Sequence, residues 1–438
     1  MDDSAPSGGG SGLERRRHVA FYLRHLSMLP QPYTSADSQR LTLAYFALSS
    51  LDLLGAIEGK ISQADRAEYA DWIYEQQCSA ERGGGFRGGP GVGSAVPSLA
   101  TLGPSASAAA AHAVDVDVEV EVDAGLPPVA SSPRPSRVLE RLGGGNLAMT
   151  YTALLSLAIL RDDFARLDRA AILAHLSSCQ QRDGSFAPSV GHREYDCRFL
   201  FCAFAVCWML DDWSAIDVDR AIGFLRRSRC WDGSFGQSET QEGHGGSTYC
   251  AVAALALANR LDELDEVDES AAPPTASSSG SSAATDSTST AGGGRRAELE
   301  RWLLSRQQSG TGFNGRLEKP VDTCYSFWCG AALQILGQHH HIDAASDIGW
   351  ILSAVSPVGG ISKVPDDPPD LMHSYLSTAA LSLHAHGEPA QSDEIESDDA
   401  AAVALRAGLR SSLQPLDPAL NLSESSKAWL VQHLHRHR

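Results

Sequence analysis

Long apolar runs, paired cysteines and an excess of basic charge are all missing from this sequence of 438 residues. No stretch reaches the roughly eighteen apolar residues that a transmembrane helix needs, and residues 1–4 do not begin a signal peptide. The nine cysteines are an odd number without a C-x-x-C pair, which is typical of free thiols in a reducing, cytoplasmic compartment. A net charge of −19 opposes nucleic acid as the main partner, because phosphate binding needs a basic surface.

Turn-like segments recur along the chain at similar intervals. Each combines a polar or basic pair with a glycine and a large apolar residue, and a small-residue apolar segment such as 325–331 follows. Gly184 and Gly233 are 49 residues apart, and Gly312 and Gly359 are 47 apart. A period of about 48 residues in helical sequence predicts one helical hairpin per repeat, with an amphipathic outer helix and a small-residue inner helix.

Two intervals are longer than the others, and each contains a low-complexity insert. An interval of 99 residues contains an Ala/Ser/Pro/Gly-rich insert at 91–142, and one of 79 residues contains a Ser/Thr/Gly/Ala tract at 267–296. Neither composition can bury a core, so both inserts are predicted to be disordered, unless a partner strand edge covers the alternating acidic–Val run at 115–123. The predicted domains are a disordered N-terminus at 1–13, one interrupted domain at 14–425 and a C-terminal tail at 426–438.

This all-α pattern leaves two architectures open. The hairpins could stack as an open solenoid or close into an α/α barrel, and the period alone does not choose between them. In a closed ring, the polar residues at the starts of the inner helices would meet at one mouth, where helix N-termini favour an anion. These residues are Asp196, Arg198, His244, Asp322, Cys324, Asp370 and His373.

Asp322, Cys324 and His373 form a first candidate site. The first two are two residues apart and converge only if Asp322 caps a helix and Cys324 lies in its first turn, where the helix N-terminus favours a thiolate. Oxygen, sulfur and nitrogen ligands suit Zn²⁺, and three protein ligands leave a fourth position open. On spacing alone, an ordinary capping Asp, a buried Cys and an exposed His explain the same residues, because D-x-C is a weak signal.

A second candidate site lies immediately upstream. Arg316 and Lys319 precede the D-x-C motif, and with His244, Tyr325 and Lys363 they could hold a diphosphate. The alternative explanation is solvated surface charge, and composition does not decide between the two.

Longer motifs resemble the β subunits of protein prenyltransferases. Residues 319–328 (KPVDTCYSFW) resemble their zinc and diphosphate motif, and residues 244–250 (HGGSTYC) resemble their HGG-[ST]-T-[YF]-C segment. The segments similar to the type I geranylgeranyl enzymes are 17–19, 40–52, 146–152 and 417–423. The resemblance covers residues from about 15 to 425 apart from the two inserts.

The resemblance implies an α/α barrel of six inner and six outer helices that pairs with a prenyltransferase α subunit. It also implies one Zn²⁺ per β subunit on Asp322, Cys324 and His373. The residues implied to bind geranylgeranyl diphosphate are His244, Gly245, Gly246, Arg316, Lys319, Tyr325, Ser326, Phe327, Trp328 and Thr42. Arg198 and Leu376 are implied to contact the peptide.

The implied reaction attaches a geranylgeranyl group to the cysteine of a C-terminal CaaX motif, with X often Leu, in proteins such as Rho-type small GTPases. Zinc would favour the substrate thiolate, and cationic donors would stabilise the departing diphosphate. Lys363 aligns with a lysine of type I enzymes and with an aspartate of farnesyl enzymes that recruits Mg²⁺. We therefore expect Lys363 to act in catalysis and Mg²⁺ not to be required.

Farnesyltransferase and Rab-type β subunits are the rival enzymes, and a non-catalytic α/α-barrel scaffold is the rival from another class. Thr42 opposes farnesyl transfer, because farnesyl enzymes are expected to have a bulky Trp there that shortens the lipid pocket. The combined zinc and diphosphate candidates oppose a scaffold. Two positions depart from the family pattern: Asn146 replaces a common His, and Leu376 replaces a common aromatic residue beside the peptide pocket.

Overall fold

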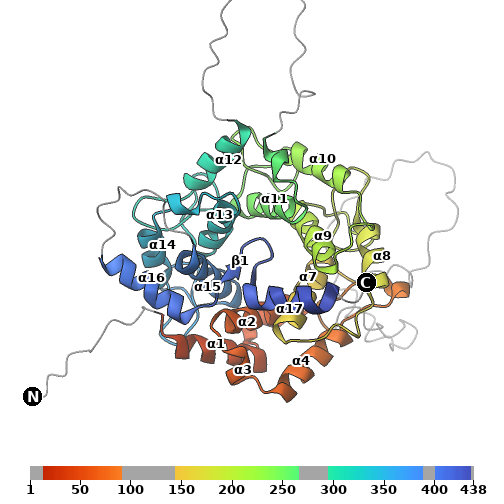
Figure 1. The fold of residues 1–438 in the computed structure, drawn as a ribbon, viewed down its shortest axis with the longest axis horizontal. Coiled ribbons are helices and arrows are strands. Elements are labelled where there is room, and N and C mark those ends of the chain that lie inside the picture. Colours follow the sequence, from red (N-terminus) through yellow and green to blue (C-terminus); the bar gives the residue numbers. More distant parts are fainter. Residues whose placement is uncertain (1–12, 91–143, 266–293, 388–399, 436–438) are drawn as a thin grey trace, which may run out of the picture.

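The inner helices form a closed ring (Figure 1). The structure is a computed structural model that describes residues 13–90, 144–265, 294–387 and 400–435. The inner helices are α2 (Arg40–Leu53), α7 (Leu147–Ile159), α9 (Cys197–Leu210), α11 (Gly245–Leu257), α13 (Thr323–Ile335) and α15 (Leu371–His386). Each packs against the next, and α15 packs back on α2. The chain is therefore the closed α/α barrel and not the open solenoid.

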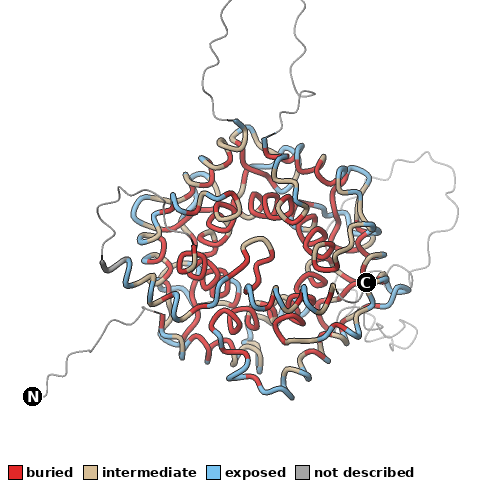
Figure 2. Tube along the Cα trace, in the orientation of Figure 1, coloured by how far each residue is buried: buried red, intermediate tan, exposed pale blue. Residues whose placement is uncertain are grey.

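A second layer of helices surrounds this ring. Its members are α1 (Arg15–Ser27), α4 (Gln63–Glu75), α8 (Arg169–Cys179), α10 (Val218–Ser228), α12 (Arg295–Leu304) and α14 (Ala344–Ser353). The inner helices are almost wholly buried, whereas the outer helices expose one face (Figure 2). Small side chains explain the close inner packing: Ala251, Ala253 and Ala254 of α11 are all completely buried.

Short helices complete the connections around the two layers. These are η1 (Gln31–Gln39), α3 (Ile57–Lys60), η2 (Ala80–Arg82), η4 (Leu261–Leu264) and η6 (His339–His341). Outside the ring, α16 (Ala400–Ser412) packs on α15. None of the helices in the described ranges is long and apolar enough to span a membrane.

The recurring turns adopt the same geometry in five repeats. In each one, a residue at the end of the outer helix forms a single antiparallel bridge with the large apolar residue of the motif. The bridges are Gln77–Phe86, Gln180–Phe186, Arg229–Phe235, Gln307–Phe313 and Val355–Ile361. Gly184 has a φ of +93°, and a Cβ there would lie 2.0 Å from the Arg220 carbonyl oxygen, so the motif requires glycine. The sequence period therefore marks a repeated structural unit.

The C-terminal segment closes one end of the ring. Strands β1 (Leu416–Asp417) and β2 (Leu422–Ser423) form an antiparallel hairpin whose loop lies inside the ring (Figure 1). Four tyrosines of the inner helices donate to backbone carbonyls of residues 418–421 at 2.5–2.9 Å: Tyr45, Tyr151, Tyr249 and Tyr375. We call residues 416–423 the plug. These buried bonds satisfy loop carbonyls that would otherwise be costly to enclose.

Three predicted boundaries need correction. The predicted tail at 426–438 contains most of α17 (Glu424–Leu434), which packs on α7 and α9 because Leu430 and Leu434 share one buried face. Helix α12 begins at Arg295, so the second insert ends earlier than predicted. Leu13 is buried and belongs to the folded domain. The remaining predictions for the inserts and for residues 1–12 lie outside the described residues.

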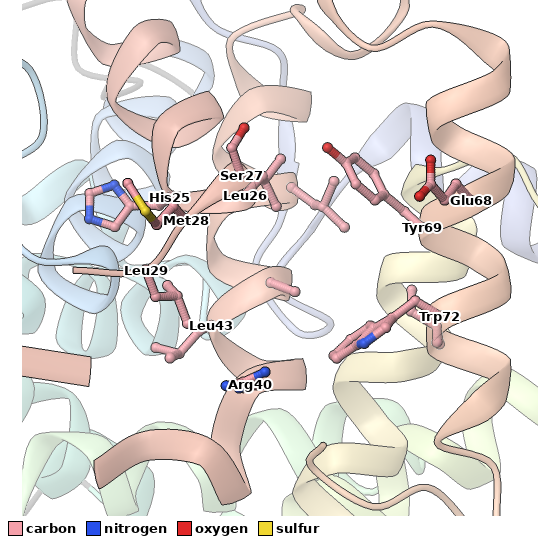
Figure 3. Close-up of a pocket in the computed structure, with 13 residues that line it drawn as sticks. His25, Leu26, Ser27, Met28, Leu29, Arg40, Leu43, Glu68, Tyr69 and Trp72 are labelled. Atoms are coloured by element: carbon pink, nitrogen blue, oxygen red, sulfur yellow. The ribbon is translucent and has the colours of Figure 1, made fainter. Parts of the chain in front are cut away.

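One large cavity lies outside the ring, between α1, α2 and α4 (Figure 3). Its volume is about 440 Å³, and Leu43, Trp72 and Met28 are among its apolar lining residues. It contains none of the predicted site residues. The candidate site lies instead at the end of the ring opposite the plug.

Candidate functional site

Helix caps fix most of the polar residues at the mouth. Asp196, His244, Asp322 and Asp370 are the N-caps of α9, α11, α13 and α15, and each side chain accepts a hydrogen bond from a backbone N–H of the first helical turn. N-terminal backbone groups of a helix lack partners inside the helix, so a capping side chain is held in a defined position. Inner-helix N-termini therefore present side chains at one mouth.

Asp322, Cys324 and His373 meet at this mouth. Asp322 caps α13 and Cys324 lies in its first turn, as the two-residue spacing requires. One ligand atom from each of the three residues lies within 4.8 Å of the others. Tetrahedral ligands at roughly 2.0–2.3 Å from zinc stand about 3.3–3.8 Å apart, so small side-chain movements would complete the coordination. The donor set and its buried position fit a zinc ion with an open fourth position.

Asp370 orients the histidine of this donor set. Its Oδ2 lies 2.5 Å from Nδ1 of His373, which leaves Nε2 directed at Asp322, 3.3 Å from Oδ1. Burial disfavours the imidazolium, but the hydrogen bonds to Asp322 and Asp370 outweigh it and raise the pKa of His373 to about 9. A carboxylate on the far nitrogen of a ligating histidine is the usual arrangement at zinc sites.

The helix N-terminus was expected to favour a thiolate at Cys324, but other features of the site act in the opposite direction. Burial first, and the Asp322 carboxylate second, raise the pKa of the Cys324 thiol well above its usual range. The thiol is 5 % exposed and lies beside a negative charge, and both features disfavour the thiolate. A bound cation is therefore needed to keep Cys324 as a thiolate.

His244 and Tyr325 form the centre of the diphosphate candidate. The backbone N–H of Gly246 donates to Nδ1 of His244 at 3.1 Å, so the neutral ring carries its proton on Nε2. Burial first, and then the nearby Arg316 and Arg198, lower the pKa of His244, which keeps it neutral. Its Nε2 lies 2.8 Å from the Tyr325 hydroxyl and donates to it. The proton of Tyr325 thus remains available for another acceptor.

Three cationic side chains were predicted around this pair. Nη1 of Arg316 lies 2.6 Å from Oε2 of Glu242, and Lys319 is exposed on the same segment. Nζ of Lys363 lies 3.8 Å from Oδ2 of Asp322, although its side chain is 57 % exposed. Lys363 is therefore beside the metal-ligand group.

An apolar cavity of about 290 Å³ lies beneath the mouth, inside the ring. It brings together residues predicted from five separate parts of the chain. These are Thr42, Arg198, His244, Gly246, Trp328 and Leu376. Asn421 of the plug also lines the cavity, so the plug forms part of its floor.

Six of the residues predicted to bind the lipid diphosphate do not line this cavity: Arg316 and Lys319, together with Gly245, Tyr325, Ser326 and Phe327. Ser326 donates to buried Asp347 of α14 at 2.6 Å and so points out of the ring. Gly245 packs against Cys329 and Tyr325, where a Cβ would be crowded at 3.0–3.2 Å, and Tyr325 itself is directed at His244. Phe327 packs behind the cavity wall, with its ring 5.2 Å from that of Tyr249.

An aromatic belt surrounds the cavity, and of its residues only Phe327 was predicted as a site residue from the sequence. Adjacent rings, with centroids 5.2–6.1 Å apart, run from α15 through α2, α7, α9 and α11 to α13. Its members are Tyr375, Tyr45, Tyr151, Phe201, Tyr249 and Phe327. Each lies at the fifth or sixth position of its inner helix. Aligning the repeats on their helix starts would have revealed this belt.

The fold and the site together define a class of protein: an α/α toroid that carries a candidate metal site and a candidate anion site at the mouth of an apolar cavity. The model of the prenyltransferase alpha-alpha toroid domain matches residues 13–422, and the chain belongs to this prenyltransferase family.

Comparisons with individual relatives support this family assignment. The chain is 33 % identical over 384 residues to the geranylgeranyl transferase type-1 subunit beta of Dictyostelium discoideum, covering 85 % of this chain and 92 % of the relative. It is 32 % identical over 381 residues to the same subunit of Arabidopsis thaliana, covering 87 % and 86 %. The solved Candida albicans protein geranylgeranyltransferase-I, complexed with GGPP, shares the fold with a TM-score of 0.69 at 22 % identity, over 96 % of this chain and 99 % of that chain.

Proposed function

We propose that this chain is the catalytic β subunit of a type I protein geranylgeranyltransferase, which modifies the cysteine of C-terminal CaaX motifs. The observation that carries the proposal is the Asp322–Cys324–His373 donor set at the mouth of an apolar cavity that reaches Thr42. Two relatives at 32–33 % identity are named as type-1 β subunits, which supports the choice among prenyltransferases.

The donor set indicates what a bound metal would do in the reaction. A zinc ion held by Asp322, Cys324 and His373 would supply a fourth position at which a substrate thiol loses its proton near neutral pH. Asp370 keeps Nε2 of His373 directed towards Asp322 and the centre of the donor set, where the metal would be held. The chain thus provides the ligands, their orientation and a partly buried environment.

The transfer itself forms a carbon–sulfur bond at C1 of the lipid and breaks the bond between C1 and the diphosphate oxygen. The electron pair of the broken bond leaves with the diphosphate, where negative charge accumulates. The Tyr325 hydroxyl, fixed by His244, can donate to that charge, while Arg316 and Lys363 supply positive charge from the same mouth. Aromatic residues that line the cavity below would hold the isoprenoid, including Tyr45, Tyr151, Phe201, Tyr249 and Trp328.

The proposal includes a partner and a set of substrates. A prenyltransferase α subunit would complete a heterodimer, and the substrates would be geranylgeranyl diphosphate and CaaX-terminated proteins such as Rho-type small GTPases. Both relatives are named as β subunits, which supports the heterodimer. We also propose a cytoplasmic location. All nine cysteines are free, as expected in a reducing compartment.

Co-expression with a prenyltransferase α subunit tests the function directly. The purified complex should transfer the C20 lipid in preference to the C15 lipid, and should favour a peptide ending in Leu over one ending in Ser. The chain without an α subunit should show little or no transfer. Equal or better use of farnesyl diphosphate would reject the type I assignment, and full turnover by the single chain would reject the heterodimer.

A further inference from the structure

Glu242 lies at the proposed diphosphate site without a place in the mechanism above. Its Oε2 lies 2.6 Å from Nη1 of Arg316, and the two side chains are 55 % and 41 % exposed. A carboxylate beside a cationic anion-binding group competes with the anion for the same N–H donors. We propose that Glu242 is a positioning residue that holds Arg316 in the ligand-free enzyme and competes with the diphosphate for Arg316. This proposal rests on the proposed function.

The backbone around Glu242 is fixed against the neighbouring turn. A Cβ added at Gly243 would lie 1.8 Å from Oγ of Ser234, and one added at Gly236 would lie 2.6 Å from the carbonyl oxygen of Gln241. The N–H of His244 also donates to the carbonyl oxygen of Phe235 at 3.1 Å. The residues on both sides of Glu242 are therefore packed, which keeps its carboxylate at the mouth.

The segment that carries Arg316 is fixed as well. The carbonyl oxygen of Gly315 accepts from the N–H of Gly245 at 2.8 Å, and a Cβ at Gly315 would lie 2.2 Å from the Tyr325 ring. Arg316 thus starts from a defined point between α11 and α13. Its flexible side chain contacts Glu242, and in the proposal it turns from Glu242 to the diphosphate.

The exposure of this ion pair determines how strongly it competes. An ion pair whose side chains are half exposed changes a binding constant by about fivefold at most, because water solvates both partners. A diphosphate offers Arg316 several charged oxygens and bidentate geometry, so it displaces the single carboxylate. Glu242 therefore weakens ligand binding modestly without preventing it. The benefit is that free diphosphate, which is a product of the reaction, leaves more readily.

Inorganic diphosphate is the probe, and its binding to the complex of this chain with an α subunit is measured by calorimetry. Glu242→Gln should tighten the dissociation constant by about fivefold, the scale of an exposed ion pair. The matched control is Glu239→Gln, which lies three residues earlier on the same turn and pairs with Arg227 at 3.7 Å. An unchanged or weaker constant in Glu242→Gln, or an equal tightening in the control, overturns the proposal.

A second pair of variants separates competition for Arg316 from simple charge repulsion. In an Arg316→Gln background, adding Glu242→Gln should change diphosphate binding by less than about twofold, because no ion pair remains to compete. Retention of the full tightening in that background overturns the role of Arg316. In transfer assays, Glu242→Gln should lower KM for the lipid diphosphate and leave the single-turnover rate unchanged, a split that a folding defect does not produce.

These measurements also distinguish the inference from the proposed function. Diphosphate binding is measured without any transfer, so a complex that binds diphosphate but transfers no lipid refutes the function alone. A complex that transfers geranylgeranyl while Glu242→Gln binds diphosphate no tighter refutes the inference alone.

Discussion

The two ends of the ring are built from the same helices but have opposite chemistry. At the mouth, helix N-termini carry Asp322, His244 and their neighbours, and the side chains remain available to ligands. At the other end, C-terminal carbonyls are satisfied within the protein: that of Leu53 accepts from the N–H of Gln414, and that of Ala385 accepts from Arg410, both at 2.7 Å. Helix polarity explains the difference, because unpaired N–H groups attract anions and unpaired carbonyls need donors.

The largest expected effect concerns the metal ligands at the mouth. Cys324→Ala should abolish transfer and reduce bound zinc from one ion per complex to background, because two protein ligands hold zinc poorly. Lipid diphosphate binding should persist, since it uses other groups. Metal analysis and a transfer assay check this, with Cys329→Ala on the same buried helix as the control. Normal zinc content in Cys324→Ala would show that the donor set is assigned incorrectly.

The next effect concerns the charge of Lys363. We expect the wild-type complex to need zinc but not Mg²⁺, because the Lys363 ammonium lies at the mouth, 3.8 Å from Asp322. Lys363→Asp should lower the rate without Mg²⁺ by about 100-fold, the scale of losing one preorganised charge at a leaving group. Added Mg²⁺ should restore part of it.

Rates in zinc buffer, with and without Mg²⁺, measure this dependence. Lys60→Asp on the short helix α3 makes the same charge change at a distant exposed position and should have no effect. Strong stimulation of the wild-type complex by Mg²⁺ would contradict the role of Lys363.

A smaller effect is expected inside the cavity, between the two ends. Thr42 lines the cavity, and its hydroxyl lies 3.5 Å from Sδ of Met149. Thr42→Trp should fill the space for the last isoprene unit and shift the preference towards farnesyl diphosphate by roughly tenfold or more, the scale of one pocket contact. Competition between the two lipids measures the shift, with Thr42→Ser as the conservative control. An unchanged ratio would place the end of the lipid elsewhere.

The smallest effect on transfer is expected at the plugged end. Tyr151→Phe removes the 2.7 Å hydrogen bond to the carbonyl oxygen of Leu420 and leaves a buried acceptor unsatisfied. We expect a loss of about 1–3 kcal/mol in the free energy of unfolding. Zinc content should stay normal. Denaturant unfolding measures this, and Tyr195→Phe, at a 47 % exposed position, is the control. Equal stability of the two variants would mean that the plug bonds contribute little.

The sequence predicted the local features of the site well. The spacing of Asp322 and Cys324 required a cap and a first-turn position, and both are observed. The repeated turns were placed correctly because glycine at Gly184 and a buried Phe186 are local requirements of one motif. The sequence-based predictions failed where residues of other helices determine the pKa or the direction of a side chain. The pKa of Cys324 depends on burial by the surrounding ring, and Ser326 points to Asp347, twenty-one residues later on α14.

By itself, the sequence determined the helices, their repeat and the identity of the mouth residues, because periodicity and capping act over a few residues. Only the tertiary structure decided that α15 returns to α2, that the plug meets Tyr45 and Tyr375, and that Glu242 reaches Arg316. Those pairs are separated by 46 to 376 residues and are set by the packing of whole helices against one another. Local signals cannot encode that geometry, since it exists only once the ring has closed.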